Sequence, residues 1–418
     1  MHVRVTLFCM VLSIFFSPSP ARSNELSKYN LPLPELQQDP NLLQELLNKP
    51  TVVKSPVRIV QSTEHQDQHS GHGGSRMQEQ LEPLNEDADG DLGFADVPHM
   101  SLRGFFDISY IAILKGPNNS SFAAGQLSLQ FNSQLSERIN FMAETYFSNP
   151  ASGQSTFILT RANLQYLIAE FFNVEVGQMH TPIGYWNHAY HHGTWLQTTI
   201  NRPEIFRYDQ AYVPIHSFGI ELFGLKSFNS YDAEYAFDIL NGRGRTPTEV
   251  VRVQDYNDSK AVNLHLNLKP HFIEGLQLGP TLYLDTIPPN PGVVTRTGSI
   301  YERIVGGHAV YYHANVELLG ELFSIYHDDT SKKVYMTTGF YLQGGYKMGR
   351  FTPYYRFDFM NFTDGEPYFV DTEDKSIHTV GLRWDIATWN AIKVEYSFED
   401  MRHSEDVQSF TINSSFVF

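Results

Sequence analysis

The sequence contains almost no cysteine. Cys9 is the single cysteine among 418 residues, and the preceding Thr6-Leu7-Phe8 does not match a lipoprotein signal. Cys9 also lies in an apolar run that export would remove, which leaves the mature chain without cysteine. An exported protein without disulfides depends on a large core or a large closed hydrogen-bonded structure for its stability. A β-barrel meets both conditions.

Long apolar runs and net positive charge are also missing. After the N-terminal run, no stretch is apolar over the length of a membrane-spanning helix, although the chain holds 23 Tyr and 30 Phe. Any membrane crossing must therefore use strands, which points to the outer membrane of a Gram-negative bacterium. The formal net charge of −16 argues against a phosphate-backbone partner, and nucleic-acid binding is not expected.

The N-terminus has the pattern of a signal peptide. A basic start at Met1–Arg4 precedes an apolar run over 5–16 and a small-x-small cleavage site at Ala21-Arg22-Ser23. A membrane-anchor helix is the alternative, but the run is shorter than a span requires and prolines follow it. We expect residues 1–23 to be removed, which takes the formal charge from −16 to −18 through the loss of Arg4 and Arg22.

Residues 24–96 differ in composition from the rest of the chain. They are rich in proline and glutamine and poor in aromatic residues, which predicts a weakly ordered periplasmic tail with a helical turn over 41–47. Within the tail, His65, His69 and His72 form an H-x3-H-x2-H cluster. Closely spaced imidazoles can capture zinc, copper or nickel, whereas the alternative is a flexible polar linker that happens to be rich in histidine.

From about residue 97 to 418 the pattern changes to period two, as in strands with one apolar and one polar face. We predict an all-β fold, a transmembrane antiparallel β-barrel of about 16 strands with an inward-folded loop. The strands are expected near 100–113, 122–132, 137–148, 157–168, 171–179, 215–225, 231–241, 261–269, 276–286, 308–317, 319–327, 334–348, 351–361, 377–387, 389–399 and 407–418. Segment 319–327 alternates poorly, so fourteen strands remain an alternative.

The last predicted strand is the clearest of the sixteen. Phe410, Ile412, Phe416 and Phe418 share one face, and the chain ends on an aromatic residue. This strand resembles the C-terminal strand of outer-membrane proteins, in which a terminal Phe belongs to the signal read by the barrel-assembly machinery. A soluble β-sandwich or propeller is the structural alternative, but no repeat of 40 to 50 residues supports it.

The polar parity of the strands carries charges of both signs, which we expect to face a water-filled lumen. Three strands near the C-terminus repeat one couplet of a basic and an acidic residue, and register is expected to place opposite charges side by side across strands. This ladder either stiffens the wall or sets a transverse field across the pore. It consists of Arg356/Asp358, Arg383/Asp385 and Lys393/Glu395.

The longest aromatic-rich connector, 181–214, is expected to fold into the barrel and narrow it, because surface loops rarely expose so many aromatic side chains. The candidates for lining the constriction and the solute path are Tyr185, Trp186, His188, His191, His192, Trp195, Arg202, Glu204 and Arg207. His188, His191 and His192 form a second metal-ligand pattern, although histidines that hydrogen-bond among Tyr and Trp are the commoner case.

The segment that begins at Gly177, GQMHTPIGYWNHAYHHGTWLQTTINRPEIFRYD, resembles one in bacterial outer-membrane porins related to the phosphate-selective porin O/P group. The resemblance implies a homotrimer of sixteen-stranded pores with a loop folded inward. It does not extend to phosphate selectivity, which rests on lumenal Arg and Lys, because the chain has 34 acidic and only 23 basic residues after residue 94. A general or weakly cation-preferring channel fits better.

The expected function is therefore passive diffusion of small hydrophilic solutes or ions through a barrel surrounded by outer-membrane lipid, without enzymatic activity. Divalent metal capture by the tail would be its one link to a cofactor. Two alternatives are an outer-membrane hydrolase, for which no G-x-S-x-G or comparable signature is present, and a structural barrel whose lumen is plugged.

Overall fold

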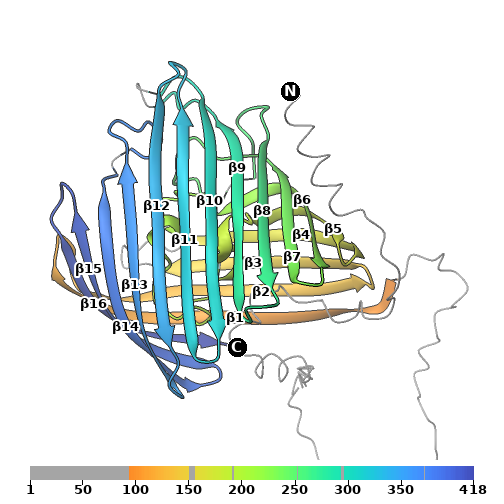
Figure 1. The fold of residues 1–418 in the computed structure, drawn as a ribbon, viewed down its shortest axis with the longest axis horizontal. Helices are drawn as coiled ribbons and strands as arrows, with labels where there is room; N and C mark the ends of the chain where they lie inside the picture. The colour runs from red at the N-terminus through yellow and green to blue at the C-terminus, as the bar shows by residue number, and fades with distance from the viewer. Residues whose placement is uncertain (1–93, 150–155, 191–192, 252, 293–295, 371) are drawn as a thin grey trace, which may run out of the picture.

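A computed structural model of the chain describes residues 94–149, 156–190, 193–251, 253–292, 296–370 and 372–418. Its sixteen antiparallel strands follow one another around a closed barrel, and β1 pairs with β16 to complete the ring (Figure 1). The strands are β1 (Phe94–Lys115), β2 (Ser121–Ser136), β3 (Ile139–Asn149), β4 (Thr156–Ala169), β5 (Phe172–His180), β6 (His216–Ser227), β7 (Tyr231–Leu240), β8 (Ala261–Pro270), β9 (Leu276–Ile287), β10 (Ile300–His313), β11 (Val316–Asp328), β12 (Val334–Tyr346), β13 (Phe351–Phe362), β14 (Lys375–Ala387), β15 (Asn390–Met401) and β16 (Val407–Val417). The predicted barrel of sixteen strands is confirmed.

The largest difference from the predicted strand bounds is at β10. Strand β10 begins at Ile300, eight residues before the expected start, and it ends at His313 instead of 317. The difference at the end of β10 arises at the hairpin to β11, where Ala314 adopts a φ of 52°. Two-residue hairpins need such positive φ values, and Asn or Gly usually marks them, so an alanine at this position hides the turn from sequence patterns. Strand β11, which alternates poorly, is nevertheless paired along its whole length.

The connections alternate between the two ends of the barrel. At one end they are turns of two to five residues, at 137–138, 170–171, 228–230, 271–275, 314–315, 347–350 and 388–389. The other end carries the longer connections, including 181–215, 241–260 and 363–374. Strand β16 ends at the short-turn end, where β1 begins. The predicted signal peptide 1–23, and His65, His69 and His72 of the tail, lie outside the described residues.

The wall has the reverse polarity of a soluble sheet. On β8, Asn263, His265 and Asn267 face inward and are buried. The outward face exposes large apolar side chains, such as Leu322 and Leu342, whose relative exposures are 51% and 58%. Soluble proteins rarely expose an apolar surface of this extent, and it is the pattern of a barrel whose outer face contacts lipid. No helix among the described residues has the length and apolarity to cross a membrane.

The terminal phenylalanine completes the seam between β1 and β16. Gly104 and Phe418 exchange two backbone hydrogen bonds, with N–O distances of 2.6 and 2.9 Å. A Cβ atom on Gly104 would lie 2.3 Å from the Phe418 ring, so only glycine leaves room for the ring in this position. The last residue of the chain therefore packs onto the first strand of the barrel.

We expect Gly275→Ala to destabilise the barrel by at least about 3 kcal/mol, because it combines backbone strain with a steric clash. Gly275 has a φ of +81°, and an added Cβ would lie 1.8 Å from the Tyr312 carbonyl oxygen, a backbone atom that cannot rotate away. Gly349→Ala is the matched control. Gly349 has a φ of +61°, and an added Cβ would have no atom within 4 Å, so only backbone strain of about 1 kcal/mol is expected. Urea unfolding in detergent micelles measures both variants. Equal losses would contradict the role of the clash.

Candidate functional site

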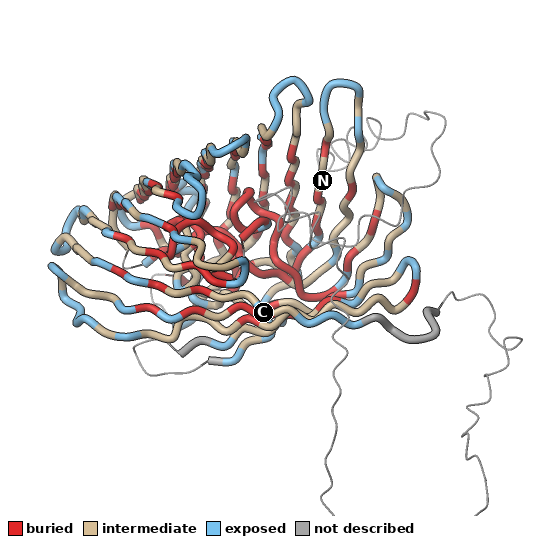
Figure 2. Tube along the Cα trace, turned by 90° about the horizontal axis from the view of Figure 1, so that it is seen from below, coloured by how far each residue is buried: buried red, intermediate tan, exposed pale blue. Residues whose placement is uncertain are grey.

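The connection 181–215 lies inside the barrel, as predicted. Figure 2 shows its buried stretches within the ring of strands. Phe206 has no exposed surface and contacts the rings of Phe323 on β11 and Tyr341 on β12, across the lumen from the strands that the loop connects. The loop contains a short helix α3 (Gly184–Ala189) and a 3-10 helix η3 (Glu204–Phe206). We refer to residues 181–215 as the inner loop.

The first part of the inner loop is attached to the wall through Glu321 on β11. The Glu321 carboxylate accepts hydrogen bonds from the backbone N–H groups of Tyr185 and Trp186, each at 2.7 Å, and from the Tyr341 hydroxyl at 2.8 Å. N–H groups in the first turn of a helix lack partners within the helix and carry partial positive charge, so a carboxylate suits them. Gly184 is required here, because its φ is +71° and a Cβ would lie 2.3 Å from Glu321 Oε2.

The middle of the inner loop is held by Lys393 on β15. This lysine has no exposed surface, and its ammonium group donates to the backbone carbonyls of Thr194, Gln197 and Thr199. The distances to Gln197 and Thr199 are 2.6 and 2.9 Å. An irregular buried segment needs partners for its backbone groups, and three ammonium protons supply three of them.

The rest of the ladder performs the same task. Arg383 donates to the carbonyls of Trp195 and Gln197 at 2.8 and 2.9 Å, and Arg356 donates to those of Asn201 and Arg202 at 2.6 and 3.2 Å. The acidic members of the ladder take the opposite groups. Glu395 accepts the Ile200 N–H at 2.6 Å, and Asp358 accepts the Glu204 N–H at 2.9 Å. The wall from β13 to β15 thus binds the backbone of the inner loop between Thr194 and Glu204.

The predicted pairing of the ladder is therefore wrong. Opposite charges pair within a strand, at 2.8 Å in both Arg356–Asp358 and Arg383–Asp385, and register places Arg383 directly opposite Lys393. The prediction that water surrounds these charges is also wrong for this part of the lumen, because Arg356, Asp358 and Lys393 are 97% or more buried. The physical reason is that the inner loop takes the place of water. Its backbone carbonyls accept hydrogen bonds from both Arg383 and Lys393, which stabilises these two neighbouring positive charges.

The structure distributes the nine predicted constriction residues over several environments. Tyr185 and Trp186 pack into the core cluster, while His188 and Trp195 each face a cavity. Desolvation inside the barrel lowers the pKa of His188 to about 4, so its imidazole is neutral near pH 7. The ring stacks at 6.3 Å from His265, which in turn stacks at 5.2 Å from His308. His191 and His192 lie outside the described residues.

The three charged candidates are tied to near neighbours. Arg202 lies over the Tyr208 ring at 5.3 Å, Glu204 binds Lys375 at 2.5 Å, and Arg207 binds Asp209 at 2.5 Å. Burial raises the pKa of Asp209, but the hydrogen bonds from Arg207 outweigh it and hold that pKa below the usual value. No group of three or more potential metal ligands converges within the part of the chain that the structure describes.

Sequence reasoning missed a buried network near the long-loop end. Arg243 of connection 241–260 donates to Glu302 on β10 at 2.8 Å and to the Tyr212 carbonyl of the inner loop at 2.9 Å. His327 on β11 bridges Glu302 to Glu366 of connection 363–374. The network ties three long connections to the wall. No short motif marks it, because its members are brought together only by the pairing of distant strands.

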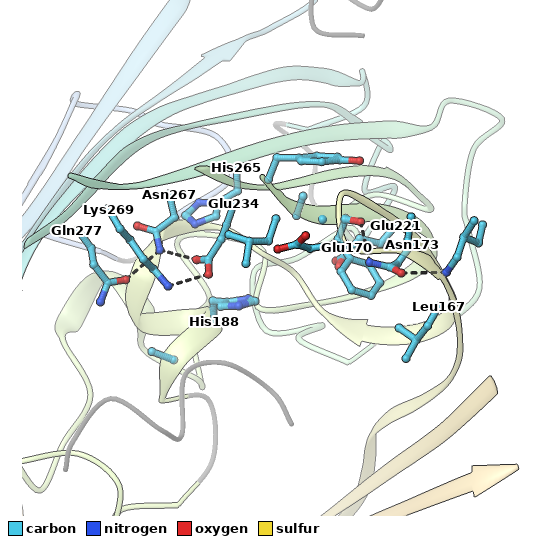
Figure 3. A pocket seen from close by; sticks show the side chains of 18 of the residues that line it. Leu167, Glu170, Asn173, His188, Glu221, Glu234, His265, Asn267, Lys269 and Gln277 are labelled. Carbon is cyan, nitrogen blue, oxygen red and sulfur yellow. Dashed lines mark hydrogen bonds and ion pairs between the residues drawn. The ribbon is translucent and has the colours of Figure 1, made fainter. Parts of the chain in front are cut away.

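Two cavities remain at the short-turn end. The larger has a volume of about 730 Å³ and lies between α3 and the inner face of β2 and of β4 to β9 (Figure 3). Glu234 on its wall binds Lys269 at 2.7 Å and the Asn267 amide at 2.8 Å. The smaller cavity, of about 340 Å³, lies near Trp195, Lys347 and Arg383. Turn residues line both cavities, which places them at the short-turn mouth of the barrel.

A closed barrel of sixteen antiparallel strands with a long loop folded into the lumen is the architecture of outer-membrane porins. Solved structures confirm this fold. The chain is similar to a loop L8 deletion mutant of OmpT, an outer-membrane protein of Vibrio cholerae, with 11% identity, a TM-score of 0.55 and coverage of 77% of this chain and 100% of that one. The anion-selective porin from Comamonas acidovorans is also similar, with 12% identity, a TM-score of 0.55 and coverage of 77% of this chain and 100% of that one.

OmpF of Salmonella typhi, in a complex with daunomycin, gives 12% identity, a TM-score of 0.52 and coverage of 76% of this chain and 97% of that one. At these identities the likeness concerns the fold. No protein-family model and no curated protein matches the sequence.

Proposed function

We propose that the protein is an outer-membrane, porin-like channel for the passive diffusion of small hydrophilic solutes or ions. The observation that carries this proposal is the combination of an apolar outer surface with an inner loop that crosses a polar lumen and leaves cavities at the short-turn mouth. A structural barrel needs no such loop, whereas a channel uses one to set the width and the charge of its passage. The signal-peptide pattern and the C-terminal strand support export to the outer membrane.

A homotrimer assembled in outer-membrane lipid after recognition of the last strand by the barrel-assembly machinery completes the proposal. One structure with this fold, OmpT of Vibrio cholerae, is described in a trimer form. The relation to the phosphate-selective porin O/P group is part of the proposal too, but phosphate selectivity is not. The larger cavity has four glutamates, Glu137, Glu170, Glu221 and Glu234, against Arg138 and Lys269. This balance favours cations.

The purified protein is expected to produce stepwise conductance in planar bilayers. In a tenfold KCl gradient, the reversal potential should have the sign of a weak cation preference, with a potassium-to-chloride permeability ratio of about 2 to 5, because the lumen is acidic but wide enough to keep ions hydrated. Silence of a correctly folded barrel would overturn the channel proposal. A reversal potential of the opposite sign would refute the charge argument alone.

A further inference from the structure

The larger cavity contains an apolar patch where the strand parity calls for polar residues. Leu167 on β4 and Phe223 and Leu225 on β6 occupy lumen-facing positions, and all three line the cavity. Register aligns Leu167, Asn173 and Phe223 in one row across β4, β5 and β6. Tyr185 and His188 of the inner loop line the same cavity. A lumen that only conducted hydrated ions would have no use for this patch.

The next row of the same strands is acidic. Glu175, Glu221 and Asp238 lie directly opposite one another on β5, β6 and β7. Glu175 is satisfied by the amides of Asn163 and Gln165, each at 2.6 Å. Asp238 accepts one amide hydrogen bond, from Asn263 at 2.8 Å, and Glu221 accepts none from an amide among the described contacts. Asp238 is fully buried, yet its Oδ1 has no hydrogen-bond partner, and no basic residue among those described lies at ion-pair distance from Glu221 or Asp238.

Like-charged carboxylates on adjacent strands repel each other, and this repulsion is costly unless one of them keeps a proton or a cation is present. A neighbouring acid in the same lumen has its counter-charge, because Glu234 binds Lys269. Glu221 lines the cavity, so a cation that enters from the short-turn mouth can reach it. The spacing is also defined, because Glu221 and Phe223 point the same way, about 7 Å apart along β6.

We propose that this cavity binds organic amines: an ammonium group at Glu221, whose strand neighbour is Asp238, and an aromatic or aliphatic body on Leu167, Phe223 and Leu225. The assignment rests on the proposed channel function and names the class of solute that the channel selects. A cavity of about 730 Å³ is in the range of small-molecule sites, and an arylalkylamine has its charge and its ring at the required separation.

The test uses the full-length protein in planar bilayers with 2-phenylethylammonium as the probe. Added on the side of the short-turn mouth, it is expected to interrupt the current in a concentration-dependent way. The neutral isostere 2-phenylethanol and the ring-free cation ethylammonium should block far less, because each lacks one half of the match. Glu221→Gln is expected to weaken the block by about tenfold, as for the loss of one charged hydrogen bond. This change removes a carboxylate repulsion and leaves the side-chain shape intact.

A second variant, Phe223→Ser, tests the apolar half and should weaken the block by phenylethylammonium while leaving the response to ethylammonium unchanged. Glu405→Gln, on the exposed connection 402–406, is the control for a loss of one negative charge outside the lumen. If wild-type channels conduct in plain salt but the amine blocks no better than the alcohol, the amine site is refuted and the channel stands. If the folded barrel never conducts, the channel proposal fails, and calorimetry of the amine with the detergent-solubilised protein decides the site: binding lost in Glu221→Gln supports it, and no binding overturns it.

Discussion

Lys393→Met is expected to destabilise the barrel by about 3–5 kcal/mol and to increase its conductance, because it breaks a buried charge interaction and releases the middle of the inner loop. The ammonium group is the shared donor for the carbonyls of Thr194, Gln197 and Thr199. Methionine has nearly the same length but no donor, so three buried carbonyls lose their partner. We expect the segment to move off the wall, and single-channel conductance to rise by about twofold or more as the passage widens.

Lys347→Met provides the matched control. Lys347 lies in the exposed turn 347–350 and lines the smaller cavity, but its side chain makes no hydrogen bond to the inner-loop backbone among the described contacts. The same chemical change there should shift stability by less than about 0.5 kcal/mol. Guanidinium unfolding in micelles and single-channel recording measure both variants. A Lys393→Met channel with wild-type conductance and stability would show that the ladder does not hold the loop.

The fold could be predicted from local patterns, because the residues of a membrane-barrel strand show by their own alternation which side faces the lipid and which faces the lumen. In β8, Val262 and Leu264 alternate with Asn263 and His265, and this alternation alone indicates which face meets the lipid. The inward course of the inner loop was also predictable, since Trp186 and Phe206 need a buried environment. A loop exposed to solvent at the end of the barrel would not provide one.

The partners of the lumen charges could not be read from the sequence in the same way. The ladder residues were found by parity, but Lys393 binds a carbonyl of Thr194, which lies 199 positions away in the chain. Backbone groups carry no sequence signal, so a pattern that looks for opposite side chains finds Asp385 or Glu395 instead. The same limit hid the link between Arg243 and Glu302, which depends on the register of β10 and on the path of a long connection.

Glu321→Ala is expected to release the other end of the inner loop and to destabilise the barrel by about 3–5 kcal/mol, since two buried N–H groups lose a charged acceptor. Glu321→Gln keeps the length and one acceptor oxygen, so about half of that loss is expected. Limited trypsin digestion is the second measurement, because a protease can reach the Arg207–Tyr208 bond only if the loop leaves the lumen. Unchanged digestion in Glu321→Ala would contradict the clamp.

The double variant Glu321→Ala, Lys393→Met distinguishes a loop that opens as a unit from one that opens in parts. The two clamps lie on β11 and β15 and share no contact, so independent sites would give additive losses within about 0.5 kcal/mol. If the first substitution already frees the whole inner loop, the second finds no interaction left to break. The conductance of the double variant then equals that of the more open single variant, and its loss of stability falls clearly below the sum. We expect this second outcome, because both clamps hold parts of the same inner loop, and the backbone of residues 184–190 and 193–200 has no other charged acceptor than Glu321 and Glu395 among the described contacts.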